Sequence, residues 1–276
     1  MIVEPAPAKI NLALHVRRKR EDGYHELETL FAFLADGDEI RVAIADAPQF
    51  VVTGPFAAAL RDTPGNLVTA AERAFAATFG IAGAHALLLR KRLPVASGIG
   101  GGSADAAATL RGLARLHGIA LDDPRLFDCA ERLGSDVPAC LLGHTAIGTG
   151  RGEQLKPLEG TAGIPVLLVN PGVAISTAQV FARWDGQDRG GLGEGRPIVL
   201  AMRGRNDLEI PARVLAPEID TVIEALKKAQ RPWLVRMSGS GATCFALYDT
   251  EDDRTRAAST IRRNGKGWWC LESVLV

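Results

Sequence analysis

The sequence predicts an α+β protein of two domains, residues 1–155 and 156–276, and three observations support this prediction. Apolar and polar residues alternate strictly over residues 8–16, which is the period of a β-strand. Helical spacing of apolar residues occurs beside short apolar runs in both halves, so helices accompany the strands. The composition changes over residues 150–163, where we place the boundary between the domains.

An antiparallel sheet is expected at the start of the chain. Strand patterns and turn residues alternate here: strands over residues 8–16, 27–34 and 40–44, with turns at 21–23 and at Asp36-Gly37. In the first strand, Lys9, Asn11 and His15 share one face, and apolar residues occupy the other. We therefore expect a half-buried strand with a polar face.

Capping signals mark the helices of the first half. Asn66 is typical of an N-cap, and Asp123 followed by Pro124 places an acid at the cap and proline at the first helical position. The predicted order is helix, strand, glycine-rich segment and two helices: residues 66–78, 84–92, 97–102, 103–117 and from 123 onward. Residues 134–138 end the last of these and begin a short new element.

Strands and helices also alternate in the second half. Thr250 with Asp253 resembles a capping arrangement for a helix that ends near Arg263. The other expected elements are strands over 164–169, 233–237, 243–248 and 268–276 and a helix over 217–230. Residues 185–196 hold five glycines and little that is apolar, so we expect a mobile loop there and assign it no function.

Composition excludes several classes of partner. Lys plus Arg and Asp plus Glu are equal at 32 each, so no net field attracts nucleic acid. The four cysteines lie far apart without C-x-x-C spacing, which argues against a metal site or a disulfide framework. No segment reaches the roughly 18 apolar residues of a membrane helix, and no secretory signal begins the chain. We expect a cytoplasmic enzyme with no membrane partner, as a monomer or weak homodimer.

The densest chemical signal is the glycine-rich segment before the helix at Ser103. Glycines let backbone N–H groups close around a phosphate, and a helix N-terminus adds its positive dipole end. A flexible turn is the alternative interpretation. No Gly-Lys-Ser/Thr follows, so this is not a Walker A loop, and Ser103 stands where a dinucleotide fingerprint has its third glycine.

Three segments resemble motifs of the GHMP kinases, the family of galactokinase, homoserine kinase and mevalonate kinase. They are residues 7–12, 94–107 and 238–243, in the family's order and across nearly the whole chain. Residues 8–12, 22–25, 93–102, 134–138 and 206–209 are further similar to the branch of the family that phosphorylates a cytidyl diphosphate sugar alcohol for isoprenoid synthesis. The chain is thus identified as a member of this family.

The resemblance implies a ribosomal-protein-S5-like N-terminal domain and a ferredoxin-like C-terminal domain with the active site between them. It also implies transfer of the γ-phosphoryl group of ATP to the 2-hydroxyl of that sugar alcohol, with Mg²⁺ expected beside ATP and held, in one interpretation, by Ser103. We expect no metal ligated by the protein alone. The alternatives are a GHMP kinase for homoserine or a mevalonate-like substrate, and a non-catalytic nucleotide-binding protein on the same scaffold.

The resemblance also assigns roles to single residues. Asp136 is implied as the catalytic base, although local sequence favours a helix cap, and Lys9 is implied as its partner, although such a lysine is often only a solubilising charge. ATP binding is implied for Asn66, otherwise a helix cap, and for the glycine-rich segment: Pro94, Val95, Ala96, Ser97, Gly98, Ile99, Gly100, Gly101, Gly102 and Ser103.

Substrate binding is implied for a second set of residues. Tyr24 would stack on the cytosine ring and His25 would bond its edge, although a tyrosine after a tight turn is often merely exposed. Phe181 would close the opposite face, or else be a core residue of a helix. The remaining members of this set are Asn11, Thr177, Gly239 and Gly241.

Overall fold

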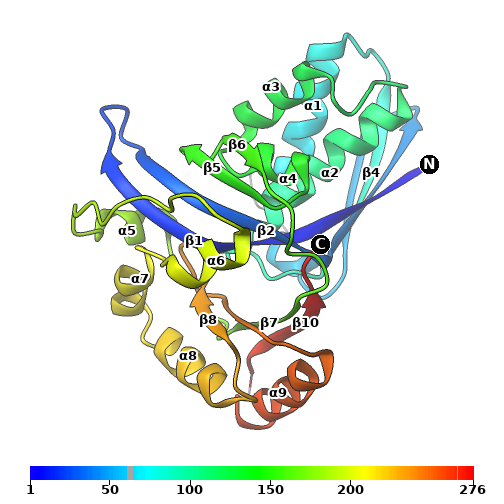
Figure 1. The fold of residues 1–276 in the computed structure, drawn as a ribbon. Helices are drawn as coiled ribbons and strands as arrows, with labels where there is room; N and C mark the ends of the chain where they lie inside the picture. The colour runs from blue at the N-terminus through cyan, green and yellow to red at the C-terminus, as the bar shows by residue number, and fades with distance from the viewer. Residues whose placement is uncertain (61–64, 266) are drawn as a thin grey trace. The chain divides into compact units, whose positions relative to one another are not determined.

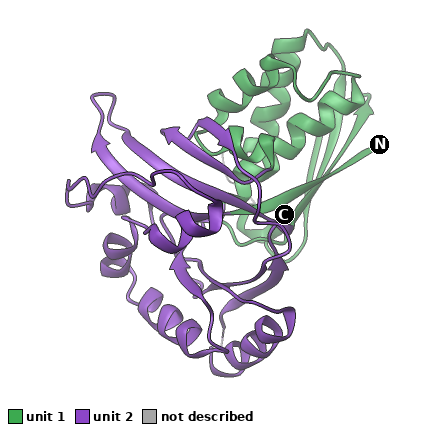
Figure 2. Ribbon diagram, in the orientation of Figure 1, with its two compact units in different colours: residues 1–9, 36–95, 100–143 green, residues 10–35, 96–99, 144–276 purple. Residues whose placement is uncertain are grey.

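The computed structural model describes residues 1–60, 65–265 and 267–276, with helices and strands mixed along the chain as predicted (Figure 1). Two compact units divide it (Figure 2). Unit 1 comprises residues 1–9, 36–95 and 100–143, and unit 2 comprises residues 10–35, 96–99 and 144–276. Each unit is therefore assembled from several separate stretches of chain. The predicted domain boundary at residues 155 and 156 stays a prediction.

Two long strands run through the N-terminal region, where shorter ones were expected. Strand β1 spans Ile2–Lys19 and pairs with β2, which spans His25–Ala45 without interruption. The predicted turn at Asp36-Gly37 was wrong. A Cβ atom at Gly37 would lie only 2.1 Å from the carbonyl oxygen of Ala6, so glycine here permits the backbone of β1 to approach and does not reverse the chain.

The polar face of β1 is buried, not half-exposed as expected. Lys9, Asn11 and His15 are each at most 3% exposed. Each has a partner: Lys9 an ion pair, Asn11 the hydroxyl of Thr29, and His15 the backbone of Arg205. Burial of these polar groups is tolerated because hydrogen bonds replace those they would make to water.

Unit 1 combines part of a sheet with a group of helices. Strand β4 (Ala84–Arg90) pairs antiparallel with residues 39–45 of β2 and parallel with β3 (Gln49–Thr53). The helical elements are η1 (Ala57–Leu60), α1 (Leu67–Phe79), α2 (Gly101–Leu116), α3 (Pro124–Leu133) and α4 (Val137–Leu142), and α1 to α4 pack on one another. The predicted caps are confirmed, since Asn66 accepts from the Val68 N–H and Asp123 from the Arg125 N–H.

Unit 2 contains the first half of β2 and a second sheet. Strand β5 (Ala146–Gly150) pairs with residues 27–31 of β2 and with β6 (Gln154–Pro157). The second sheet has the order β10-β7-β9-β8, with bounds Trp269–Val274, Pro165–Asn170, Cys244–Leu247 and Leu234–Met237. Helices α8 (Glu218–Lys228) and α9 (Glu251–Asn264) cover this sheet (Figure 1), and Thr250 caps α9 as predicted.

Three short helices of unit 2 were not predicted: α5 (Thr177–Ala182), α6 (Pro197–Arg203) and α7 (Glu209–Leu215). Between α5 and α6, residues 185–196 have no regular structure, as expected. This loop is nevertheless fastened to the first two strands, because Arg17 binds Asp188 and the Leu192 N–H donates to Glu28. Among the described residues, no helix is both long and apolar enough to cross a membrane.

Candidate active site

Lys9 and Asp136 form an ion pair in unit 1. The ammonium of Lys9, on β1, lies 2.9 Å from a carboxylate oxygen of Asp136. Asp136 occupies the N-cap position of α4, yet its side chain makes no capping hydrogen bond. The Lys9 side chain is 4% exposed and that of Asp136 is 33% exposed. A buried cation therefore holds a carboxylate that remains accessible to a substrate.

The first turn of α2 lies beside this pair. Gly100 is the N-cap residue, has φ of 66° and offers no side chain to cap the helix, so the N–H groups of the first turn remain available to an anion. The aliphatic part of Lys9 packs against Gly100, where a Cβ atom would lie 2.8 Å from Cγ of Lys9. Helix N-terminus, cation and carboxylate thus adjoin one another in unit 1.

The start of α1 borders the same glycines. A Cβ atom at Gly102 would lie 3.5 Å from the Leu67 side chain, so the corner formed by Asn66 and Leu67 is next to the glycine-rich turn. The cap interpretation of Asn66 is confirmed by its hydrogen bond to the Val68 N–H. A cap and a place beside a nucleotide are compatible roles, since capping uses only one side-chain oxygen.

A buried triad of charged side chains lies next to the glycine-rich segment. The ammonium of Lys91 lies 2.6 Å from Asp38 and 2.6 Å from Asp105, and a Cβ atom at Gly101 would lie 3.1 Å from it. Burial and the Asp38 carboxylate raise the pKa of Asp105 to about 7, against the opposing charge of Lys91. Burial lowers the pKa of Lys91, but the two carboxylates outweigh it and leave that pKa raised. The triad ties α2 to the end of β4.

Residues of all three family-like motifs meet in unit 2. The hydroxyl of Ser238 accepts from the Asn11 N–H at 3.2 Å and donates to the Gly98 carbonyl at 2.9 Å. A Cβ atom at Gly98 would lie 2.6 Å from the Gly241 carbonyl, and one at Gly239 would lie 3.3 Å from the Asn11 amide oxygen. Glycine is required at Gly98 and Gly239 because backbones and an amide meet there with no space for side chains.

Aromatic rings gather on β2 and α5 of unit 2. The His25 and Phe181 rings are stacked with centroids 4.8 Å apart, and the Trp184 ring meets His25 edge-on at 5.7 Å. Burial, aided by the charge of Lys19, lowers the pKa of His25, so its ring is neutral at pH 7. Tyr24 is 54% exposed and lies under the guanidinium of Arg151 at 5.1 Å.

Two family models match the chain: the GHMP kinases N terminal domain over residues 66–144 and the GHMP kinases C terminal over residues 195–267. A Rhizorhabdus wittichii protein named 4-diphosphocytidyl-2-C-methyl-D-erythritol kinase is 51% identical, over 99% of this chain and 94% of its own. The chain belongs to the GHMP kinase family. It is an ATP-dependent small-molecule kinase, as the three motifs predicted.

Other comparisons agree with the assignment of this chain to the GHMP kinase family. An Erythrobacter litoralis protein of the same name is 48% identical over the full length of both chains. A crystal structure of 4-(cytidine 5'-diphospho)-2C-methyl-D-erythritol kinase is 35% identical, covers 99% of both chains and superposes with a TM-score of 0.80. Homoserine kinase from Cytophaga hutchinsonii, 20% identical with a TM-score of 0.75, has the same fold.

Within each unit, the structure brings together several of the residues predicted for this GHMP kinase. Lys9 meets Asp136, and Phe181 meets His25 while packing partly against the core of unit 2. The hydroxyl of Thr177 lies 2.8 Å from that of Ser240. Tyr24 does not stack on Phe181 in this structure, because its exposed ring associates with Arg151.

Several residues that contact the predicted ones were missed by sequence reasoning: Lys91 lies next to Gly101, Trp184 meets His25 and Arg151 lies over Tyr24. They carry no local signal, since a lone lysine, tryptophan or arginine has many uses in a sequence. Ser238 was within a predicted motif, and its small hydroxyl directly before Gly239 was the available sign of a bridging role. Among the described residues, no group of three or more His, Cys, Asp or Glu side chains is arranged to hold a metal ion.

Proposed function

We propose that this kinase phosphorylates the tertiary 2-hydroxyl of 4-diphosphocytidyl-2-C-methyl-D-erythritol, giving the 2-phosphate and ADP. Near-full-length identity of about half to proteins of that name supports the substrate. The observation that carries the chemistry is the 2.9 Å pair of Lys9 and Asp136 beside the N-terminus of α2. Phosphoryl transfer depends mainly on alignment and charge neutralisation, and these groups supply both.

Asp136 is proposed as the base. The 2-hydroxyl oxygen forms a bond to the γ-phosphorus, the bond from that phosphorus to the bridging oxygen of ADP breaks, and the hydroxyl proton passes to Asp136. Lys9 orients the carboxylate and places a positive charge where negative charge develops on the transferred group. Its burial strengthens that effect, because less water screens it.

The donor is proposed to bind at the glycine-rich segment. Backbone N–H groups of Gly101, Gly102 and Ser103 would receive the phosphates, with Asn66 near the adenine and the residues before the glycines along the nucleotide: Pro94, Val95, Ala96, Ser97, Gly98, Ile99 and Gly100. The Ser103 hydroxyl is a hard oxygen ligand that fits Mg²⁺ held chiefly by the phosphates of ATP. The ion would neutralise phosphate charge when bound.

The acceptor is proposed to bind through groups of unit 2. A neutral His25 has one donor and one acceptor nitrogen, which suits the mixed donor and acceptor edge of cytosine. The Tyr24 and Phe181 rings are proposed to bind the faces of the base. The sugar alcohol and diphosphate are proposed to contact the remaining predicted residues, Asn11, Thr177, Gly239 and Gly241. A cytoplasmic location and a monomeric or weakly dimeric state stay predictions.

Incubation with Mg-ATP and each of three acceptors tests this proposal. Phosphorus NMR should locate a new phosphate on the 2-hydroxyl of the cytidyl substrate, and homoserine and mevalonate should give none above background. Each reaction is followed by ADP release, with ATP alone as the control for hydrolysis. Phosphorylation of homoserine or mevalonate without the cytidyl substrate would overturn the proposed acceptor and leave the kinase assignment intact.

A further inference from the structure

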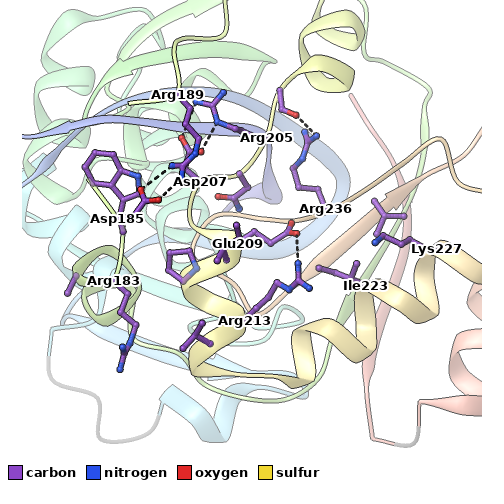
Figure 3. A pocket seen from close by; sticks show the side chains of 18 residues that line it. Arg183, Asp185, Arg189, Arg205, Asp207, Glu209, Arg213, Ile223, Lys227 and Arg236 are labelled. Atoms are coloured by element: carbon purple, nitrogen blue, oxygen red, sulfur yellow. Dashed lines mark hydrogen bonds and ion pairs between the residues drawn. The ribbon is translucent and has the colours of Figure 1, made fainter. Parts of the chain in front are cut away.

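A cavity of about 770 Å³ lies entirely within unit 2, among α5, α7, α8, β8 and the loop after α5 (Figure 3). None of the residues to which we assign catalysis or substrate binding lines it. Its volume is in the range of pockets that hold a small organic molecule. The cavity is therefore a candidate for a second site.

The charged groups of the cavity favour an anion. Six cationic and three carboxylate side chains line it. Arg189 pairs with Asp185 and Arg205 with Asp207 (Figure 3), Arg213 pairs with Glu209 and Asp220, and Lys227 pairs with Glu224. Among the described residues, Arg183 and Arg236 are therefore the lining cations without an ion pair.

Arg236 is the most informative of these cations. It is 9% exposed, and its guanidinium donates only to backbone carbonyls, those of Leu12, Ala201 and Gly204. Burial lowers the pKa of Arg236 to about 10, with only partial compensation from Glu209. No carboxylate of the described chain forms an ion pair with it, so a buried positive charge on the wall of the cavity is only partly compensated, by Glu209.

A second donor on the wall also lacks a partner. Nε1 of Trp184 is buried and makes no hydrogen bond to any part of the chain that the structure describes. Buried N–H groups without an acceptor are rare in folded proteins and often mark the place of a bound group. An acceptor-rich ligand would satisfy both Trp184 and Arg236.

The mouth of the cavity is apolar. Ile210 and Val214 stand one turn apart on α7 and are 70% and 66% exposed, and both line the cavity. Ile223, Pro211 and Val235 continue this apolar surface inward. A ligand that uses both surfaces carries an anionic head and a hydrocarbon chain.

We propose that this cavity binds an amphipathic organic phosphate, an alkyl phosphate or diphosphate, at a site separate from the donor and acceptor sites. The wall contacts the proposed acceptor groups: Trp184 meets His25 edge-on, and the Asn206 amide donates to the carbonyls of Met237 and Gly239 at 2.8 Å each. Resting on the proposed function, we infer that occupancy raises the KM of the cytidyl acceptor by holding His25 against Phe181.

Calorimetry with hexyl phosphate, inorganic phosphate and hexanol tests binding. Saturating Mg-ADP is present throughout, so that the donor site is filled. Hexyl phosphate should bind at least about tenfold more tightly than inorganic phosphate, since burial of two methylenes alone is worth that factor. It should also bind more tightly than hexanol, which has the same chain but lacks the anionic head. No binding of hexyl phosphate below millimolar concentration under these conditions would overturn the site.

Two variants locate the binding, with a matched control. Val214→Asp places a carboxylate at the exposed mouth. It should weaken the binding of hexyl phosphate by at least about tenfold, because the carboxylate repels the phosphate and an apolar contact is lost. Trp184→Phe removes the buried donor together with part of the ring and should weaken the binding of hexyl phosphate about 5- to 10-fold. Met202→Asp, at a 51% exposed position on α6 outside the cavity, should bind hexyl phosphate as the wild type does. Unaltered affinity in both cavity variants would overturn the assignment.

Steady-state kinetics tests the regulatory part separately. Hexyl phosphate should raise the acceptor KM of the wild-type enzyme and leave the KM of ATP unchanged, and Val214→Asp should abolish this response while keeping the basal rate. An unchanged acceptor KM at saturating hexyl phosphate would overturn the regulatory inference, and calorimetry would still decide on the site. A failure of the proposed acceptor itself would be recognised by the absence of turnover without any added probe.

Discussion

At the scale of single residues, Asp136 makes no side-chain capping bond to the first turn of α4 and instead pairs with Lys9. That partner is more than a hundred residues away in the sequence, and the pair supports the proposed role of Asp136 as the base. Proton transfer to a carboxylate held in this way is the step that a substitution should remove.

Asp136→Asn should lower kcat by about 10²- to 10⁴-fold, because an amide cannot accept the hydroxyl proton. The Kd of either substrate should change little, since the amide keeps the shape of the carboxylate. Single-turnover ADP release measures the chemistry, and direct binding measures the affinities. Wild-type chemistry in this variant would mean that the base is another group.

Tyr24→Ala should weaken the binding of the cytidyl substrate by roughly 5- to 150-fold, the equivalent of about 1 to 3 kcal/mol for one stacked base. The Kd of ATP should stay unchanged. Tyr24 is more than half exposed, so its truncation should not alter thermal stability. Isothermal calorimetry with each substrate measures both affinities. Equal losses for both substrates would show that Tyr24 supports the fold.

His15 is expected to make stability pH-dependent. Its Nε2 accepts from the Arg205 N–H and its Nδ1 faces the Gly190 carbonyl, an arrangement that requires the neutral ring. Burial, followed by the charge of Arg205, lowers the pKa of His15. The unfolded chain then binds a proton first as pH falls through about 6.5, so stability is present above that pH and is lost below it.

Urea unfolding at pH 7.5 and pH 5.5, in wild type and His15→Gln, measures this effect. Glutamine can donate and accept but does not titrate. The wild type should lose more stability on acidification, by at most about 1.4 kcal/mol per pH unit, the limit for one proton. Parallel losses in the two proteins would assign the acid sensitivity to other groups, such as His25 and His117, whose pKa values burial also lowers.

At the scale of elements, helix α2 combines two devices that have different physical origins. Its N-terminus is left open by Gly100, which permits the left-handed cap, whereas its second turn is tied down by Asp105 in the triad with Lys91 and Asp38. Open N–H groups bind an anion well only if they do not move, and the triad provides that rigidity.

Lys91→Met should destabilise the fold by about 3 to 5 kcal/mol, because it leaves two buried carboxylates without their cation. Urea denaturation at pH 7.5 measures the loss. Lys91→Met combined with Asp105→Asn removes one of those charges and should recover part of the stability. If the double variant were as unstable as the single one, volume and not charge would explain the effect.

At the scale of the whole molecule, the compact units and the order of the chain do not coincide. Leu14 and Val16, from the first strand, belong to the same hydrophobic cluster as Leu167 and Val169 of β7. The Asp207 carboxylate also accepts from the Val16 N–H at 2.8 Å. A unit whose core includes the N-terminal strand cannot be completed by the C-terminal half alone.

The fragment 156–276 should therefore unfold without a cooperative transition and bind a hydrophobic dye, whereas co-expression with fragment 1–155 should restore a cooperative transition. Circular dichroism during urea titration and dye fluorescence measure this. A transition in the isolated fragment as steep as that of the full chain would instead support an autonomous domain from residue 156.

The sequence by itself determined the family, the mixture of helices and strands, and the elements with local signals. Asn66, Asp123 and Thr250 cap the helices they were predicted to cap, because a capping bond joins atoms two or three residues apart. The glycine-rich segment predicted an anion site for a similar reason, because its backbone and the helix after it are neighbours in the chain.

Only the tertiary structure decided which residues face one another. Asn11 and Ser238 are 227 positions apart, and nothing near either of them in the sequence specifies the other. Gly37, predicted to lie in a turn, instead lets the backbone approach Ala6 closely. The polar face of β1 is buried because residues from elsewhere in the chain bind its polar groups. Such contacts depend on packing of the folded chain, whereas local patterns report only the conformation of a few neighbouring residues.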